Sequence, residues 1–152
     1  MKLLIVEDDS TLAEFTAELL HSLDGPAQHL EAITLASDLQ TAILCLPEHD
    51  VVLCDGAFPL SHNSRFVVEE WEVVRQEAHR RGIHFVLYSG SVRALDCARE
   101  SNIPAVAKPA TIEEIYAVLM SFPLSVIDRG YDESAIMTET GKLTGENHVP
   151  DR

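Results

Sequence analysis

The sequence has few cysteines, no long apolar stretch and little positive charge. Its three cysteines are an odd set without a C-x-x-C pair or clustered histidines, so neither a disulfide framework nor a zinc site is indicated. No apolar stretch approaches the roughly 18 residues that a membrane span needs, and the amino terminus becomes acidic too soon for a signal peptide. We therefore expect a cytoplasmic protein with reduced thiols.

Negative charge dominates, with 25 Asp and Glu against 11 Lys and Arg and a formal net charge of -14. Such a surface repels both a nucleic-acid backbone and an anionic lipid surface, so we expect direct binding to neither nucleic acid nor membrane. The length of 152 residues suits a single domain. A domain of this size buries roughly 68 to 70% of its unfolded surface and can fold without disulfides.

Short apolar runs alternate with segments of helical periodicity up to Phe122. Right-handed crossovers and short loops then predict an α/β, three-layer, doubly wound (βα)5 fold of the flavodoxin-like type, with parallel sheet order 2-1-3-4-5. We expect a domain over residues 1–122 and a tail over 123–152, mobile or locally docked, because the periodicity ends there. The expected strands are 2–6, 30–35, 51–54, 83–88 and 105–107.

Polar caps and apolar spacing predict a helix after each strand. The first helix should begin at Asp9 or Ser10, and the second and fifth at capping boxes opened by Ser37 and Thr111. The third should follow a loop over 56–65 and end at Gly82. We assign the inner face of the first helix to Leu12, Phe15, Leu19, Leu20 and Leu23, and that of the third to Val67, Val68, Trp71, Val74 and Ala78.

Four of the five apolar runs stop at residues able to bind phosphate or magnesium. In chain order these residues are Glu7 and Asp8, Asp55, Ser89, and Lys108. Because the carboxyl ends of parallel strands share one edge of a sheet, the side chains should meet near the switch point between the first and third strands. Each motif alone is equally typical of a helix cap or a turn, but their joint placement predicts a phosphoryl site.

The residue types indicate the chemistry of that site. Clustered carboxylates repel one another unless a cation joins them, and Mg²⁺ or Mn²⁺ fits Glu7, Asp8 and Asp55 because hard ions prefer oxygen ligands. Lys108 can neutralise phosphoryl oxygens, and the Ser89 hydroxyl can donate a hydrogen bond to them. Asp55 is the best candidate nucleophile, since a carboxylate can take a phosphoryl group as an aspartyl phosphate.

These motifs resemble the receiver domains of bacterial two-component response regulators. The resemblance covers residues 1 to about 122 and rests on four segments in order: 6–10 (VEDDS), 51–55 (VVLCD) with Pro59 four residues on, 87–90 (LYSG) and 107–109 (AKP). It implies that Asp55 accepts a phosphoryl group from a sensor histidine kinase or a histidine phosphotransfer protein. We expect a stand-alone receiver in phosphorelay signal transduction that acts on an unknown downstream protein, because no output domain follows.

The resemblance also implies roles for the other site residues. Asp8, Asp55 and the Ala57 carbonyl would bind Mg²⁺ directly, and Glu7 would act on the metal mainly through water. Ser89 would sense the phosphoryl group.

The resemblance further implies that Lys108 pairs with the phosphoryl group and that the peptide bond between Lys108 and Pro109 is cis.

Two positions depart from the usual pattern of the family. Ala105 stands where an aromatic residue is frequent, so signalling is expected to rest on backbone shifts of the 89–93 loop. The stretch 59–65 is longer than usual and could cover the site or contact a partner.

Three other functions stay open at this point. A phosphorelay shuttle or phosphate sink would use the same site without an output of its own. A phosphatase of the haloacid dehalogenase type also forms an aspartyl phosphate, but it usually needs a second Asp where this chain has Ala57. A Rossmann nucleotide-binding module is weaker, since no G-x-G-x-x-G follows the first strand. We expect no enzyme, beyond self-phosphorylation from small donors and autodephosphorylation.

Overall fold

The computed structural model describes residues 1–123 except 62, 64–66 and 69. Residues 124–152 of the expected tail lie outside the described residues. The central sheet is parallel and has five strands in the order β2-β1-β3-β6-β7, which is the predicted order 2-1-3-4-5 counted along the chain. Its strands are β1 (Lys2–Val6), β2 (Ala32–Ala36), β3 (Val51–Asp55), β6 (His84–Ser89) and β7 (Ala105–Ala107).

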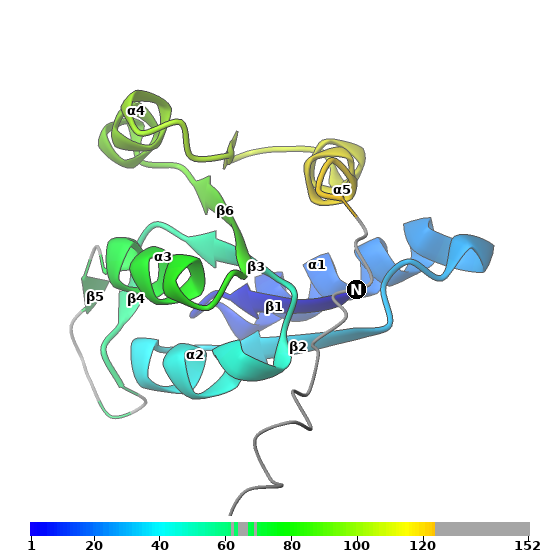
Figure 1. Cartoon of the computed structure of the whole chain (residues 1–152), viewed down its shortest axis with the longest axis horizontal. Coiled ribbons are helices and arrows are strands. Elements are labelled where there is room, and N and C mark those ends of the chain that lie inside the picture. The colour runs from blue at the N-terminus through cyan, green and yellow to red at the C-terminus, as the bar shows by residue number, and fades with distance from the viewer. Residues whose placement is uncertain (62, 64–66, 69, 124–152) are drawn as a thin grey trace, which may run out of the picture.

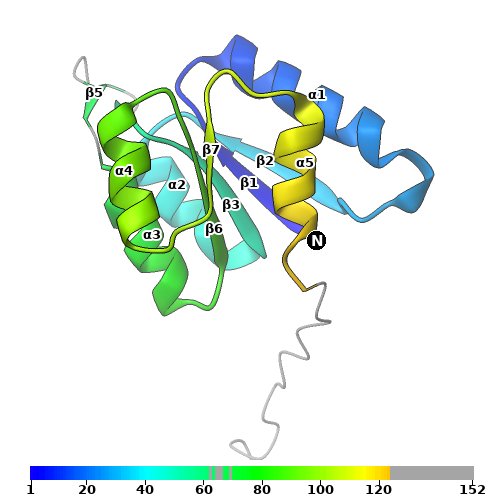
Figure 2. The same ribbon diagram turned by 90° about the horizontal axis from the view of Figure 1, so that it is seen from above.

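Five α-helices cover both faces of this sheet, so the predicted three layers are confirmed. Helices α1 and α5 lie on one face and α2, α3 and α4 on the other (Figures 1 and 2). None of the described helices is long and apolar enough to cross a membrane. The helices are α1 (Ser10–Asp24), α2 (Leu39–Cys45), α3 (Trp71–Arg80), α4 (Val92–Glu100) and α5 (Ile112–Met120), with short 3-10 turns η1 (Gly25–Ala27) and η2 (Leu46–Glu48).

The sheet is buried on both faces because its central strands are apolar throughout. All of Val51 to Cys54 is at most 1% exposed. Alternate residues of each strand enter opposite layers, as the pleat requires. Leu53 packs with the α1 and α5 layer, whereas Val52 packs with the layer of α2, α3 and α4. This continuous burial holds the ends of the strands, and therefore the residues that follow them, in fixed positions.

The segment before α3 differs from the prediction. Val67 and Val68 form the short strand β5 (Val67–Val68), which pairs antiparallel with β4 (Phe58–Pro59), and the helix begins only at Trp71. The pairing with β4 overrides the helical spacing here, in keeping with the preference of β-branched residues for an extended backbone. The loop after β4 contacts α2 through the Gln40 N–H, which donates to the Leu60 carbonyl at 3.1 Å.

The helix boundaries follow from caps. Asp9 caps α1 and Thr111 opens the predicted capping box of α5. The second helix is capped by Asp38 and not by Ser37 as predicted, because the Asp38 carboxylate accepts the Thr41 N–H at 2.8 Å and the Thr41 hydroxyl at 2.9 Å. Gly82, at φ +69°, follows α3 in the left-handed region that favours glycine.

The buried face of α1 is rotated from the predicted one. Phe15 is 56% exposed and Leu23 is 40% exposed, whereas Ala13, Thr16 and Leu20 are buried. Small residues on the inner face let the helix approach its neighbours closely, so the larger ones lie toward the edge. The start of β2 also moves from Leu30 to Ala32, since the Leu30 N–H is bonded to the Asp24 carboxylate at 2.9 Å.

Candidate functional site

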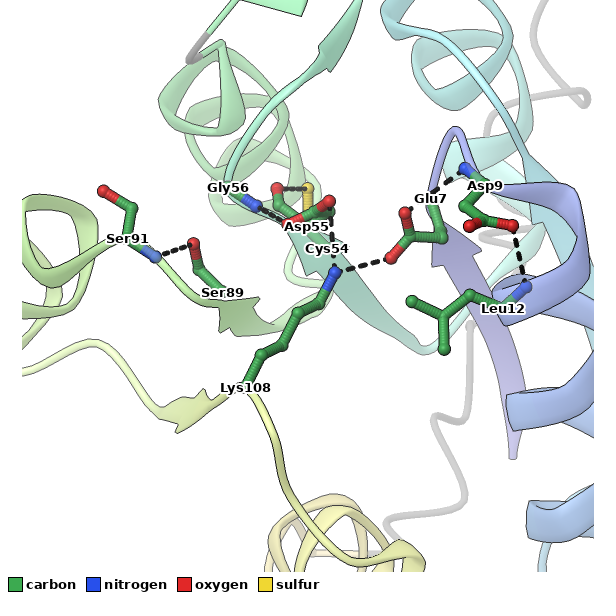
Figure 3. Close-up of polar contacts among 9 residues, drawn as sticks. All are labelled: Glu7, Asp9, Leu12, Cys54, Asp55, Gly56, Ser89, Ser91 and Lys108. Atoms are coloured by element: carbon green, nitrogen blue, oxygen red, sulfur yellow. Dashed lines mark hydrogen bonds and ion pairs between the residues drawn. The ribbon is translucent and has the colours of Figure 1, made fainter.

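The predicted site residues lie at one edge of the sheet, beyond the carboxyl ends of four strands. Glu7 follows β1, Asp55 ends β3, Ser89 ends β6 and Lys108 follows β7. In Figure 3 the Lys108 side chain points between those of Glu7 and Asp55. The sheet order produces this convergence, because β1 and β3 are neighbours although about 50 residues separate them.

Three carboxylates form an acidic cluster at the switch point. Glu7, Asp8 and Asp55 each offer an oxygen atom, and these atoms all lie within 4.8 Å of one another. Glu7 is buried, Asp8 is exposed and Asp55 is intermediate, so the cluster opens to solvent on one side. A donor set made only of carboxylate oxygens fits a hard divalent ion such as Mg²⁺. Ala57 lies in the link between β3 and β4, two residues after Asp55.

Lys108 supplies the positive charge of the site. Its Nζ atom lies 2.7 Å from Glu7 Oε2 and 3.2 Å from Asp55 Oδ2. The same atom lies 4.9 Å from the centroid of the Tyr88 ring, a distance typical of a cation–π contact. The peptide bond between Lys108 and Pro109 is cis, as the family resemblance implied.

The ionisation of the two closest partners follows from their surroundings. Burial and the nearby negative charge of Asp55 raise the pKa of Glu7, although the hydrogen bond from Lys108 opposes this. Burial by itself would lower the pKa of Lys108, but the hydrogen bond to Glu7 and the charges of Asp55 and Glu7 together raise it. Lys108 is therefore an ammonium at neutral pH, and further positive charge near Glu7 would favour its ionised form.

Asp55 is held by its own backbone turn. Its Oδ1 atom accepts the Gly56 N–H at 2.6 Å, while Oδ2 faces Lys108. Both oxygens therefore have a donor, and the side chain lies at a solvent-accessible point between the other acids and the lysine. This geometry suits a nucleophile that must be oriented while staying accessible to a reactant.

Ser89 is 2% exposed and lies beside Gly56. Its Oγ accepts the Ser91 N–H at 3.1 Å, and the Ser91 side chain in turn caps α4. A Cβ atom added to Gly56 would lie 2.3 Å from Ser89 Oγ and 3.0 Å from Ser89 Cβ. The hydroxyl can occupy this position only because residue 56 has no side chain.

Gly56 is thus a site residue that the sequence reasoning missed. Gly56 opens the predicted loop over 56–65, and nothing local in the sequence indicates that Ser89 would lie against it. The signal that could have found it is topological: β3 and β6 are neighbours in the predicted order, and Asp55 pairs with Tyr88 in the observed register.

No protein-family model matches the sequence, and no curated protein sequence matches it. Solved structures do match. A CheY-like response regulator receiver domain from Methylobacillus flagellatus is 22% identical with a TM-score of 0.61, covering 80% of this chain and 97% of that one. A response regulator receiver protein from Sinorhizobium medicae is 21% identical with a TM-score of 0.61, covering 80% and 92%.

A designed protein with a Rossmann 2x3 fold also matches, at 13% identity and a TM-score of 0.55, covering 80% of this chain and 87% of its own. These similarities and the sheet order show that the chain is a doubly wound, flavodoxin-like α/β domain. Within that class the chain has the fold of response regulator receiver domains, and the resemblance drawn from its motifs is confirmed at the level of the fold. Because a designed protein shares the fold, the chemistry must be argued from the site itself.

Proposed function

We propose that this chain is a phosphorylation-controlled signalling switch whose phosphoacceptor is Asp55. One observation carries the proposal: the ammonium of Lys108 lies between Glu7 and Asp55 in a cluster whose three carboxylates lie within 4.8 Å of one another. The donor would be the phosphohistidine of a sensor histidine kinase or a histidine phosphotransfer protein. The output would be contact with a downstream protein. Three free cysteines, one of them buried, agree with a cytoplasmic location.

The reaction would be a displacement at phosphorus. A carboxylate oxygen of Asp55 forms the new O–P bond as the P–N bond of the phosphohistidine breaks, and the bonding electron pair goes to the imidazole nitrogen. Lys108 offsets charge on the phosphoryl oxygens from one side. Asp8, Asp55 and the Ala57 carbonyl would hold Mg²⁺, with Glu7 acting on it mainly through water, and the ion would supply further positive charge for the phosphoryl oxygens.

The switch would follow from added charge. A phosphoryl group brings about 1.5 to 2 negative charges, which attract Lys108 and the hydroxyl of Ser89. To reach the phosphoryl oxygens, Ser89 would give up the N–H of Ser91, the residue that caps α4. With the small and exposed Ala105 in place of an aromatic ring, we expect the change to pass through the 89–93 loop to the start of α4.

The test is phosphorylation of the purified chain by a small phosphodonor in the presence of Mg²⁺ or Mn²⁺. Intact-mass measurement should show one added phosphoryl group, which chelation of the metal should prevent. Asp55→Asn should stay unmodified, and Asp50→Asn is the matched control that should be modified normally. A wild-type chain that gains no mass under these conditions would contradict the proposal.

We further propose that the chain is a phosphoacceptor and not a turnover enzyme. Ala57 occupies the position where an aspartate-nucleophile phosphatase usually carries its acid. Steady hydrolysis of phosphate monoesters over many turnovers would argue against this assignment. A shuttle or sink would be recognised differently, because its phosphorylation would leave the affinity for every partner other than phosphate donors and acceptors unchanged.

A further inference from the structure

A pocket lies at the opposite end of the sheet from Asp55. It has a volume of about 370 Å³ and surrounds the start of β6, whereas Ser89 of the phosphoryl site ends the same strand. Its walls come from the second half of α3, the loop between α4 and β7, and Phe122, which follows α5. The lining residues are Arg75, His79, Ile83, His84, Phe85, Ser101, Asn102, Ile103, Pro104 and Phe122.

Arg75 is the unusual residue of this pocket. Its Nε atom is buried and has no hydrogen-bond acceptor within the part of the chain that the structure describes. The neighbouring arginines differ, since Arg80 and Arg81 both pair with Glu77 at 2.6 Å. On α4, Arg99 pairs with Asp96 at 2.7 Å. A buried N–H of a guanidinium without an acceptor is costly, so an acceptor that entered this pocket would stabilise Arg75.

The residues that line the pocket favour a negatively charged ligand. In a chain of net charge -14, none of the residues that line this pocket is acidic. Arg75 and His79 are four residues apart on α3, so they lie on the same side of the helix. His84 adds a second imidazole beside that of His79, and Ser101 and Asn102 add neutral donors.

The backbone carbonyl groups near the pocket do not make it a cation site. At the end of α4, the Ala98 carbonyl accepts the Ile103 N–H at 2.8 Å, and the Arg99 carbonyl accepts the Asn102 N–H at 3.2 Å. These carbonyls are therefore used in ending the helix and are not a set of ligands for a cation. The floor of the pocket is ordered by the stacking of His84 on Phe122, whose ring centroids lie 4.4 Å apart.

We propose that this pocket binds a small phosphate-class oxyanion, with Arg75 as its main ligand. The potential donors that line the pocket come from three separate segments, α3, β6 and the loop after α4, and a tetrahedral anion offers oxygens in more directions than a flat carboxylate does. The proposal goes beyond phosphorylation of Asp55 and does not depend on it, since the two sites share no residue.

The test is a titration of the full chain with inorganic phosphate, followed by amide NMR at constant ionic strength and without divalent metal. Saturable shifts are expected at the backbone amides of Asn102 and Ile103. Acetate serves as the flat-anion comparison and should bind more weakly. Loss of hydrogen bonds to a charged group corresponds to a roughly 10- to 100-fold weaker affinity, which is the effect expected for Arg75→Gln.

The controls separate this site from general attraction to cations. Arg93→Gln removes an exposed arginine of α4 that does not line the pocket, and it should leave the affinity unchanged. His79→Gln alters an exposed position and should weaken binding by less than Arg75→Gln. The amide spectra themselves report whether each variant is folded. Unsaturable shifts in the wild type, or equal affinities of the wild type and a folded Arg75→Gln chain, would overturn the proposal.

Discussion

Two buried acids at opposite ends of the molecule have pKa values shifted in opposite directions. Asp24, at the end of α1, is 3% exposed and Glu7, in the acidic cluster, is 6% exposed. Burial by itself raises the pKa of both. For Asp24 the hydrogen bonds from the Leu30 N–H, the Tyr116 hydroxyl and the His29 N–H outweigh burial, and its pKa is lowered. For Glu7 burial and the charge of Asp55 prevail over Lys108, and its pKa is raised.

The difference lies in how completely each carboxylate is satisfied. The Asp24 carboxylate accepts three hydrogen bonds, all from neutral donors, at 2.8 to 3.1 Å. Glu7 shares one ammonium with Asp55 and lies within the acidic cluster. A satisfied carboxylate contributes to stability, whereas an incompletely neutralised one favours the arrival of a cation. Burial alone therefore does not separate a structural acid from a functional one.

The largest effect on stability is expected from Asp24→Asn, which disrupts the three hydrogen bonds of the Asp24 carboxylate. An amide nitrogen cannot accept the N–H bonds that the carboxylate accepts, so the free energy of unfolding should fall by about 2–4 kcal/mol. Urea denaturation measures the change. Tyr116→Phe removes a single donor and should cost about 1 kcal/mol. Equal stability of Asp24→Asn and the wild type would show that the three hydrogen bonds contribute nothing.

The pH dependence of the stability of Asp24→Asn tests the direction of the Asp24 pKa shift. Because the folded pKa of Asp24 lies below the unfolded value, its ionisation stabilises the fold above the unfolded pKa, and this stabilisation is lost as pH falls through the folded pKa. The stability difference between the wild type and Asp24→Asn should thus narrow in acid. A difference that widens as the pH falls would contradict the assignment.

A smaller effect is expected from Lys108→Met, which removes the ammonium and keeps much of its apolar stem. Without divalent ions the free energy of unfolding should fall by about 1–3 kcal/mol, since Glu7 and Asp55 then face each other without a cation. Mg²⁺ should stabilise the variant more than the wild type, because it no longer meets a positive charge. The control Arg93→Met should change stability by less than about 0.5 kcal/mol. A stability gap that Mg²⁺ leaves unchanged would count against a metal at this cluster.

The smallest effect on stability is expected from Gly56→Ala, which tests the close packing of Gly56 and Ser89 at the candidate site. The new methyl group would lie 2.3 Å from Ser89 Oγ, so the hydroxyl must rotate away and the backbone must shift slightly. We expect a loss of about 1–2 kcal/mol, and a smaller loss in a Ser89→Ala background where the Oγ contact is absent. Gly90→Ala is the matched control, since its Cβ would meet Lys108 Cβ at an ordinary 3.8 Å. An equal loss in both backgrounds would contradict a steric effect through the hydroxyl.

Most of the fold could be predicted because each element has a local signal. Continuous apolar runs gave the central strands, and Thr111 with Glu114 gave the start of α5. Predictions failed where a distant contact decided the outcome. The bond of Asp24 to the Leu30 N–H delays β2, and pairing with Phe58 and Pro59 makes Val67 and Val68 a strand.

The site was predictable for a different reason. Its residues follow strands directly, so the sheet order alone brings Glu7, Asp55 and Lys108 together. Gly56 and Arg75 could not be predicted from the sequence because their roles depend on residues that are distant along the chain. The sequence does not indicate that the Ser89 hydroxyl packs against Gly56, or that the Arg75 Nε lacks an acceptor among the described residues.

The ion pair between Lys108 and Glu7 joins positions 101 residues apart. During synthesis the acidic groups of β1 and β3 leave the ribosome well before the lysine that balances them. The acidic cluster therefore lacks its balancing charge until nearly the whole sheet has been translated and assembled. A nascent chain, or one truncated before Lys108, would hold these acids without their ammonium, so the charge balance of the cluster is reached only when the last strand is in place.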